Sequence, residues 1–262
     1  MIAPELVLVS TIFERGFLQV NSKLLVHSAT IFMTISIIIP TLNEAENIGV
    51  LASFLQQFKN DSIAEIVIVD GGSMDDTIAV GLRAGVKVVQ SPKKGRAAQM
   101  NYGASLAVGD VLYFIHADTI PPETYAADII KWLKAGYNIG RYCTKFNSNK
   151  QILKLNAFFT RFDLFICYGG DQTLFVNRKL FEALNGFNEN LLIMEEYDLV
   201  TRARRRAKYK IMPGDALVSA RKYHGNSWWK VQRVNYAIVR MYKAGASQEL
   251  MMKRYDELIR YR

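Results

Sequence analysis

Between residues 34 and 116, short apolar runs alternate with segments in which apolar residues recur every three or four positions. Apolar runs of this length are typical of strands buried on both faces of a parallel sheet. Strands are predicted at 35–40, 65–70, 86–91 and 111–116, and helices at 45–58, 76–84 and 96–107. The alternation predicts right-handed βαβ crossovers and an α/β, doubly wound, mostly parallel sheet. A ligand site is then expected at the carboxyl ends of the strands.

The pattern changes after Pro121 and Pro122. A helix is predicted at 123–134, then an aromatic amphipathic segment at 150–168, a glycine turn and a helix that begins at Glu195. We expect this part to lie over the first half as an acceptor-side half, not as an independent domain. The main domain is predicted at 33–225 and basic amphipathic helices at 226–262. Residues 1–32 show no comparable period and are predicted to be an N-terminal extension that folding does not require.

Charge divides the chain unevenly. The formal net charge of the 262 residues is +9, and residues 202–262 hold 16 Lys and Arg against 4 Asp and Glu. A basic region of this kind suits an anionic partner such as a phosphate, a nucleic acid or an acidic membrane surface. A solvated basic helical face is the alternative interpretation.

Several function classes are excluded by what the sequence lacks. The two cysteines, Cys143 and Cys167, are too few for a disulfide framework and too far apart for a CxxC metal pair. HExxH, GxxxxGKS/T and strand-anchored GxGxxG motifs are absent, which argues against zincins, P-loop proteins and dinucleotide-binding proteins. No apolar run approaches the ~20 residues of a membrane span. The N-terminal stretch also lacks the basic start of a signal peptide, so we expect a cytoplasmic protein.

Polar residues follow three of the predicted strands. Pro40 is expected to end the first strand, and the second ends in Asp70 followed by glycines. A carboxylate at this position suits a hydrogen bond to a base or ribose. Asp118, after the fourth strand, suits a hard divalent cation, which takes oxygen ligands from the protein and from substrate phosphates. A turn aspartate before Pro121 is the simpler interpretation of Asp118.

Taken in order, the motifs PTLNE, VDGGSMDDT, KKGRAAQMNYGA, HAD, GGDQTLFV and FNENLLIMEEYDLVTRARR resemble those of the family 2 glycosyltransferases over residues 34–225. This family is inverting, uses nucleotide-sugar donors and has the GT-A fold. The resemblance implies that Asp70 contacts the base and that Thr41 and Glu44 line the same pocket. It also implies that His116-Ala117-Asp118 stands where the family has DxD. Histidine replaces the first aspartate, and Asp118 keeps the metal-binding position.

The resemblance also assigns the later motifs. Glu195 and Glu196 occupy the position of the catalytic acids, with Glu196 as the expected general base, whereas Asp198 is expected to pair with Arg202. His224 corresponds to a histidine that completes metal coordination. The donor-binding set implied by the resemblance, together with phosphate binding by Arg96 at a helix start, is Pro40, Thr41, Asn43, Glu44, Asp70, Gly71, Arg96, His116, Ala117, Gly169, Gly170 and Asp171.

The expected function is therefore metal-assisted, inverting transfer of a sugar from a UDP-sugar to a saccharide or lipid-linked acceptor, with Mg²⁺ or Mn²⁺ as the cofactor. No nucleic-acid partner is expected. Aromatic and basic residues mix at 152–168 and in the C-terminal segment NSWWKVQRVNYAIVRMYKAG, which suits peripheral contact with the inner face of a membrane. Core packing also explains such stripes. The alternative function is a non-catalytic nucleotide-sugar-binding or interaction protein on the same fold.

Overall fold

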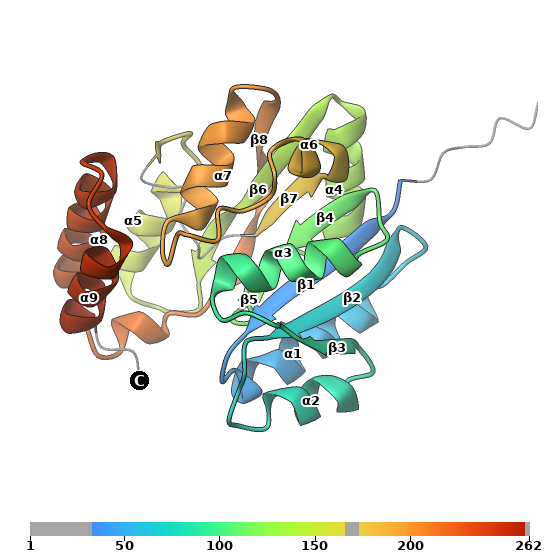
Figure 1. Cartoon of the computed structure of the whole chain (residues 1–262), viewed down its shortest axis with the longest axis horizontal. Coiled ribbons are helices and arrows are strands. Elements are labelled where there is room, and N and C mark those ends of the chain that lie inside the picture. The colour runs from blue at the N-terminus through green and yellow to red at the C-terminus, as the bar shows by residue number, and fades with distance from the viewer. Residues whose placement is uncertain (1–32, 166–172, 260–262) are drawn as a thin grey trace, which may run out of the picture. The chain divides into compact units, whose positions relative to one another are not determined.

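The computed structural model describes residues 33–165 and 173–259 (Figure 1). The predicted N-terminal extension at 1–32 and the glycine turn at Gly169, Gly170 and Asp171 lie outside these residues. Within the described part of the chain, one eight-stranded sheet has the order β3-β2-β1-β4-β7-β6-β8-β5.

The first half confirms the predicted alternation. The four strands β3, β2, β1 and β4 pair in parallel. The strands are β1 (Ile35–Thr41), β2 (Ile63–Asp70), β3 (Lys87–Gln90) and β4 (Val111–Phe114), and the helices between them are α1 (Ala45–Gln57), α2 (Thr77–Arg83) and α3 (Arg96–Leu106). The strands β1 and β4 are buried along their whole length, as their continuous apolar sequences predict.

Several strand boundaries lie one or two residues from the prediction, and two of these differences concern predicted site residues. Pro40 does not end β1, because the strand continues to Thr41, which pairs with Asp70. Proline is tolerated here because β4 pairs with β1 only as far as Ile38, so no neighbour on that side requires the missing N–H. The strand β4 itself ends at Phe114, two residues before the predicted end, and the chain turns through His116, whose carbonyl accepts a hydrogen bond from the Thr119 N–H.

The second half extends the same sheet. The strand β7 joins β4 and β6 in antiparallel pairs, and β6 pairs in parallel with β8. The remaining elements are β5 (Thr119–Ile120), α4 (Tyr125–Lys134), β6 (Tyr137–Phe146), α5 (Gln151–Phe159), β7 (Leu174–Asn177), α6 (Arg178–Ala183), α7 (Glu195–Arg204), β8 (Lys208–Val218), a 3₁₀ helix (Arg221–Tyr223), α8 (Trp228–Lys243) and α9 (Gln248–Leu258). The predicted α/β class with a mostly parallel, doubly wound sheet is confirmed.

Helices cover both faces of the sheet. Ile37 and Ile39 of β1 belong to an apolar cluster with α1 and α4, whereas Ile38 belongs to a second cluster that includes α3, α6 and α7. A third apolar cluster joins α8 and α9 to α5 and to the ends of β6 and β8 (Figure 1). None of the described helices combines the length and the apolar character needed to cross a bilayer.

Gly103 allows α3 to lie very close to the sheet. A β-carbon at this position would lie 2.5 Å from the Ile38 Cγ2 and 2.8 Å from the Val69 Cγ2. Both neighbours are fully buried strand residues, so they have little space in which to move.

We therefore expect Gly103→Ala to lower the free energy of unfolding by about 1–3 kcal/mol, as overpacking of a core does. Gly49→Ala in α1 is the matched control, because its β-carbon would meet a single methyl group of Val80 at 3.0 Å. Urea denaturation measures both variants. A Gly103→Ala protein as stable as Gly49→Ala would contradict the close packing of α3.

Candidate functional site

The carboxyl ends of β1 and β2 are held together by a side chain from α3. The Gln99 Nε2 donates hydrogen bonds to the carbonyl oxygens of Thr41, at 2.7 Å, and Val69, at 2.8 Å. Gly71 follows β2 where a β-carbon would lie 3.0 Å from the Gln99 amide. Sequence reasoning missed Gln99, because a helical glutamine carries no local sign that it contacts two strand ends.

Asp70 is fully buried and shapes the loop that follows it. Its Oδ2 accepts hydrogen bonds from the N–H groups of Gly72, at 2.8 Å, and Ser73, at 2.9 Å, and its Oδ1 accepts one from the Ser73 hydroxyl. The carboxylate that was predicted to contact a base is therefore bonded to its own loop. Its position at the ligand edge agrees with the prediction, and its role in base binding stays a prediction.

Asn43 ties the loop after β1 to the loop after β2. Its backbone adopts a positive φ of 53°, its N–H donates to the Ser73 Oγ at 2.8 Å, and its Oδ1 accepts from the Met74 N–H at 2.8 Å. The neighbouring Glu44 N–H donates to the Thr77 Oγ1 at 2.8 Å, at the start of α2. These contacts give the two loops a common shape.

Arg221, which sequence reasoning missed, joins three loops at this edge. Its guanidinium binds both carboxylate oxygens of Glu44, one of them at 2.9 Å, and its NH2 lies 3.3 Å from the Asp118 Oδ2. The Ser219 N–H also donates to the Asp118 carbonyl at 3.1 Å. The loops after β1, β4 and β8 therefore meet around one arginine. Nothing in the spacing of SARKYHGNS distinguishes Arg221 from its basic neighbours.

Ala117 and His224, two further residues of the predicted site, lie in different environments. The Ala117 side chain is buried in the core cluster with α1 and α4. His224 is exposed just after the 3₁₀ helix, and its N–H donates to the Arg221 carbonyl at 3.0 Å. Within residues 33–165 and 173–259, no three His, Cys, Asp or Glu side chains gather closely enough to hold a metal ion. Metal ligation by Asp118 and His224 stays a prediction.

A second cluster forms where the first turns of α3 and α7 meet. Arg96 opens α3 and forms an ion pair with Glu195, the first residue of α7, and its Nε lies 3.8 Å from the Glu196 Oε1. The His116 Nε2 lies 3.0 Å from the same Glu196 oxygen. Both carboxylates are buried, and the Glu195 Oε2 has no hydrogen-bond partner among the described residues. Three predicted site regions, far apart in the sequence, thus meet here.

The two adjacent acids have pKa values shifted in opposite directions. Burial raises the pKa of Glu195 and outweighs the nearby Arg96. Burial also acts to raise the pKa of Glu196, but the positive charge of Arg96 and the hydrogen bond to His116 lower it from the ordinary 4.5 to about 2. Such divergent values are typical of paired acids with different chemical roles. Glu196 is ionised at neutral pH.

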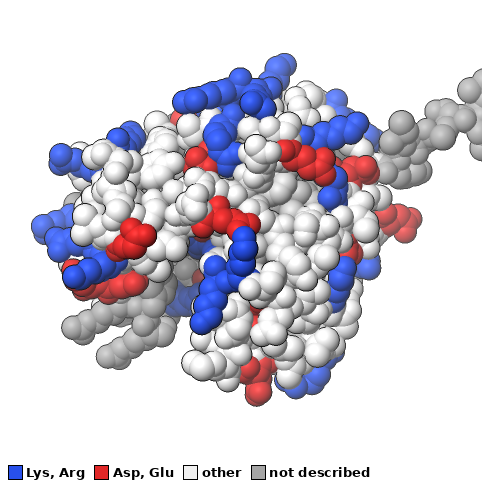
Figure 2. All heavy atoms as spheres, in the orientation of Figure 1, with Lys and Arg blue, Asp and Glu red and all other residues white. Residues whose placement is uncertain are grey.

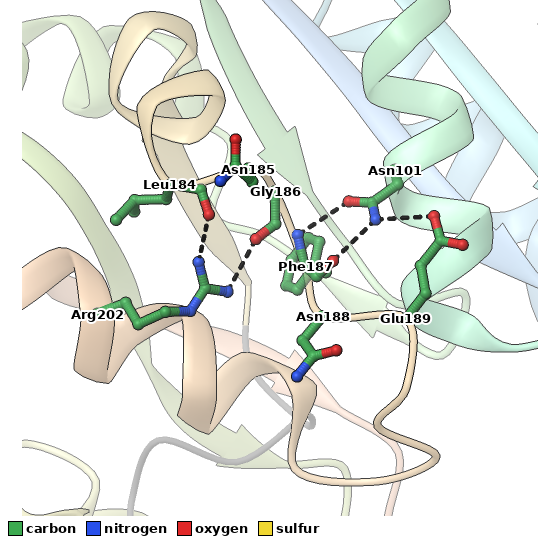
Figure 3. Close-up of a pocket in the computed structure, with 8 residues that line it drawn as sticks. All are labelled: Asn101, Leu184, Asn185, Gly186, Phe187, Asn188, Glu189 and Arg202. Carbon is green, nitrogen blue, oxygen red and sulfur yellow. Dashed lines mark hydrogen bonds between the residues drawn. The ribbon is translucent and has the colours of Figure 1, made fainter.

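The loop before α7 is braced from both sides around a pocket of about 450 Å³ (Figure 3). The Arg202 guanidinium donates to the carbonyls of Leu184, at 2.6 Å, and Gly186, at 2.8 Å. Asn101 of α3 exchanges two hydrogen bonds of 2.9 Å with the Phe187 backbone. Arg202 also pairs with Asp198, which confirms that predicted pair. These hydrogen bonds tie the loop before α7 to α3 and to the last turn of α7.

The positive charge of the C-terminal region is visible on one face of the molecule. Figure 2 shows Lys and Arg gathered over the C-terminal end of α7 and the start of β8. The basic residues of the segment 202–208 are Arg202, Arg204, Arg205, Arg206 and Lys208. Arg202 and Arg204 form ion pairs with Asp198 and Asp163.

Glu196 should contribute to stability in a pH-dependent way. Its folded pKa is below the unfolded one, so its contribution is present above about pH 4.5 and is lost as the pH falls towards about 2. We expect the difference in unfolding free energy between the wild type and Glu196→Gln to shrink across this window. Urea denaturation at about pH 5 and about pH 3 measures it. Glu195→Gln should show the opposite trend, since the pKa of Glu195 is raised, and parallel curves for both variants would contradict the assignment.

Comparison with known proteins identifies a family that this sequence resembles. The model of "Glycosyl transferase family 2" matches residues 36–185, more than half of the chain. A glucosyl-3-phosphoglycerate synthase of Mycolicibacterium smegmatis is 28% identical over 98 residues, 34% of this chain and 32% of the relative. A dolichol-phosphate mannosyltransferase of Pyrococcus furiosus is 34% identical over 112 residues, 41% of this chain and 32% of the relative. The chain thus spans about a third of the length of these curated relatives.

A solved structure shows the same fold. The mannosyltransferase of Pyrobaculum calidifontis, in complex with GDP-Man and Mn²⁺, superposes with a TM-score of 0.63 at 21% identity, and the match covers 81% of this chain and 64% of that one. With the family match over β1 to α6, the ordered motifs and the shared fold lead to one conclusion. The chain belongs to glycosyl transferase family 2.

Proposed function

We propose that this protein transfers a sugar from a nucleoside-diphosphate donor to an acceptor, with inversion at the anomeric carbon. The observation that carries the proposal is the meeting of two buried carboxylates of α7 with Arg96 at the start of α3, beside the loops at the carboxyl ends of β1, β2 and β4. This arrangement places acids, a cation and a helix N-terminus around one edge of the sheet. The names of the relatives, all transferases or synthases of sugar compounds, support it.

The nucleoside is proposed to lie at the ends of β1 and β2. Thr41 and Asp70 pair across these strands, and Glu44 directly precedes α1. Asp70 contributes there by shaping the loop, because its oxygens bind Gly72 and Ser73. A UDP-sugar is the expected donor, although the Pyrobaculum calidifontis mannosyltransferase is a complex with GDP-Man.

The diphosphate is proposed to lie at the N-terminus of α3. No described side chain caps this terminus, so its first amides point outward with the positive end of the helix dipole. Arg96 adds a full positive charge. Negative charge that develops on the leaving group is stabilised by such pre-positioned groups.

The residues present fit a divalent cation. Hard cations at phosphate sites use one or two carboxylates and take their other ligands from water and substrate oxygens. Asp118 offers a part-exposed carboxylate, already beside the charge of Arg221, and His224 is the expected second ligand. Mg²⁺ or Mn²⁺ bound there would neutralise the leaving diphosphate. The Mn²⁺ of the Pyrobaculum calidifontis complex supports this choice.

Glu196 is proposed as the general base. It is ionised at neutral pH, but Arg96 and His116 hold its pKa low and so weaken it as a base. A donor diphosphate that draws the Arg96 guanidinium towards itself removes part of this stabilisation. The pKa of Glu196 then rises when the donor is present. Arg96 would in this way couple donor binding to the strength of the base.

The acceptor is proposed to be a saccharide or a lipid-linked molecule. Dolichol phosphate, in the name of the Pyrococcus furiosus relative, is an example of the second kind. A lipid-linked acceptor would bring the protein into peripheral contact with a membrane from the cytoplasmic side.

A second candidate function is nucleotide-sugar binding without transfer. It is favoured by His116, which stands where the resemblance leads us to expect an aspartate, and whose Nε2 lies 3.0 Å from the Glu196 Oε1 and so occupies one oxygen of the proposed base. Donor binding without release of UDP from any UDP-sugar tested would support this candidate.

The base assignment predicts a split between binding and chemistry. We expect Glu196→Gln to bind UDP with Mn²⁺ as the wild type does, by thermal shift, but to release UDP from UDP-sugars about 10²–10⁴ times more slowly. Asp198→Asn is the control, because Asp198 pairs with Arg202 outside the cluster. Near-normal turnover of Glu196→Gln, or a larger loss of rate in Glu195→Gln, would overturn the assignment.

The metal assignment predicts that Asp118→Ala abolishes the Mn²⁺-dependent part of the thermal stabilisation by UDP. The carboxylate is the expected charged ligand, and its removal leaves the cation with His224, water and phosphate oxygens, a set without any protein carboxylate. Asp61→Ala, at an exposed turn before β2, serves as the control and should keep the full shift. Unchanged stabilisation of Asp118→Ala would show that Asp118 does not bind the cation.

A further inference from the structure

The segment formed by α5 and the residues after it exposes a cluster of large apolar side chains. Five of them are between 45% and 51% exposed within ten residues of sequence. This phenylalanine patch consists of Leu155, Phe158, Phe159, Phe162 and Leu164. A contiguous exposed group of this kind marks a surface that something covers.

The rings of the patch pack against one another. The Phe158 ring centroid lies 5.9 Å from that of Phe159 and 5.5 Å from that of Phe162, and the Phe159 and Phe162 centroids lie 6.2 Å apart. The opposite face of α5 is already packed, because Leu153 joins the apolar cluster with Val231 of α8. The exposed phenylalanines are therefore not the core-facing side of α5.

Cations accompany the patch. Lys154 directly precedes Leu155 and Arg161 lies between Phe159 and Phe162, and both are exposed. The Arg161 NH2 lies 3.6 Å from the Asp215 Oδ1 in an ion pair that leaves 57% of the arginine side chain exposed. The acid within the patch, Asp163, forms an ion pair with Arg204. Apolar rings mixed with cations match a surface that has an apolar interior and an anionic exterior, as an acidic bilayer has.

The patch also leads towards the candidate active site. Phe165 follows it directly, and the Phe165 ring lies 5.1 Å from that of Tyr197, the residue after Glu196. The Lys243 Nζ at the end of α8 lies 4.7 Å from the same ring. A bilayer on the patch would therefore lie near the helix that carries the two acids.

We propose that the phenylalanine patch docks this protein on the surface of an anionic lipid bilayer, with the rings inserted among the acyl chains and Lys154 and Arg161 at the headgroups. The docking itself stands on the exposure, ring contacts and charges of this segment. Its consequence, delivery of a lipid-linked acceptor to Glu196, rests on the proposed function.

Sedimentation of the full chain with lipid vesicles tests the proposal. We expect the wild type to bind vesicles of phosphatidylcholine with about one-third phosphatidylglycerol, and to bind phosphatidylcholine alone much more weakly. Leu155→Ser/Phe158→Ser/Phe162→Ser should bind the anionic vesicles at least about tenfold more weakly. Lys154→Glu/Arg161→Glu should lose the preference for anionic lipid.

A matched control replaces apolar residues elsewhere that are even more exposed than those of the patch. Val50→Ser/Leu82→Ser/Val108→Ser changes side chains that are 64%, 59% and 74% exposed, outside the patch, and should bind vesicles as the wild type does. The single variants Phe158→Ser and Phe162→Ser should each lose part of the binding, which guards against a triple variant that fails to fold. Thermal melting verifies the fold of every variant.

Three outcomes would overturn the proposal. The first is that the wild type fails to bind anionic vesicles, and the second is that folded patch variants bind them as well as the wild type does. The third is that the wild type forms a dimer which the patch variants convert to monomers. The last result would identify a second copy of the chain as the partner. Failure of the proposed function would show differently, as vesicle binding without any thermal shift on addition of UDP and Mn²⁺.

Discussion

The close approach of α3 to the sheet is the constraint on which the site depends. Gly103 lets the helix lie against Ile38 and Val69, at a distance that a β-carbon would not allow. The same helix then brings Gln99 to the ends of β1 and β2, Asn101 to the loop before α7, and Arg96 to Glu195. If a β-carbon at position 103 pushed the helix away from the sheet, all three contacts would weaken together. The geometry of the site is therefore set by packing several residues away from it.

The electrostatic character of the site follows from burial and from shared cations. Glu195 and Glu196 are adjacent in sequence and both buried, yet the pKa of the first is raised and that of the second is lowered. Burial and the neighbouring Glu196 charge raise the pKa of Glu195, whereas Arg96 and the contact with His116 together lower that of Glu196. Arg221 has a comparable position at the other end of the site, where it lies between Glu44 and Asp118. Each arginine offers a charge that an anionic ligand can compete for.

The candidate active site and the phenylalanine patch are linked through one short stretch of chain. The phenylalanine patch ends beside Phe165, and Phe165 contacts Tyr197 in the first turns of α7. Arg202 and Asn101 bind the backbone of the loop that precedes the same helix. The helix α7 thus receives contacts from the sheet-covering helix α3 and from the exposed aromatic segment. An acceptor that arrives along the patch would meet the part of the protein that carries the acids.

The sequence by itself determined the fold class and indicated several residues that the structure brings together in the candidate site. Continuous apolar strands and amphipathic helices alternate up to residue 116, and such a pattern has few stable arrangements other than a doubly wound sheet. Motif order then indicated the acids Glu195 and Glu196, Arg96 and His116, which the tertiary structure brings together. Local pattern was sufficient for this because the spacing of apolar residues, which distinguishes a buried strand from an amphipathic helix, is contained in neighbouring residues.

Contacts between distant segments were decided only by the tertiary structure. Pro40 lies within a strand because β4 ends early beside it, and Ala117 faces the core because the chain turns after Phe114. Gln99 and Arg221 have no local signal, since their partners lie 30 to 177 residues away. The opposite pKa shifts of two neighbouring glutamates have the same origin. They depend on which cations the fold places beside each carboxylate, and a one-dimensional pattern does not contain that information.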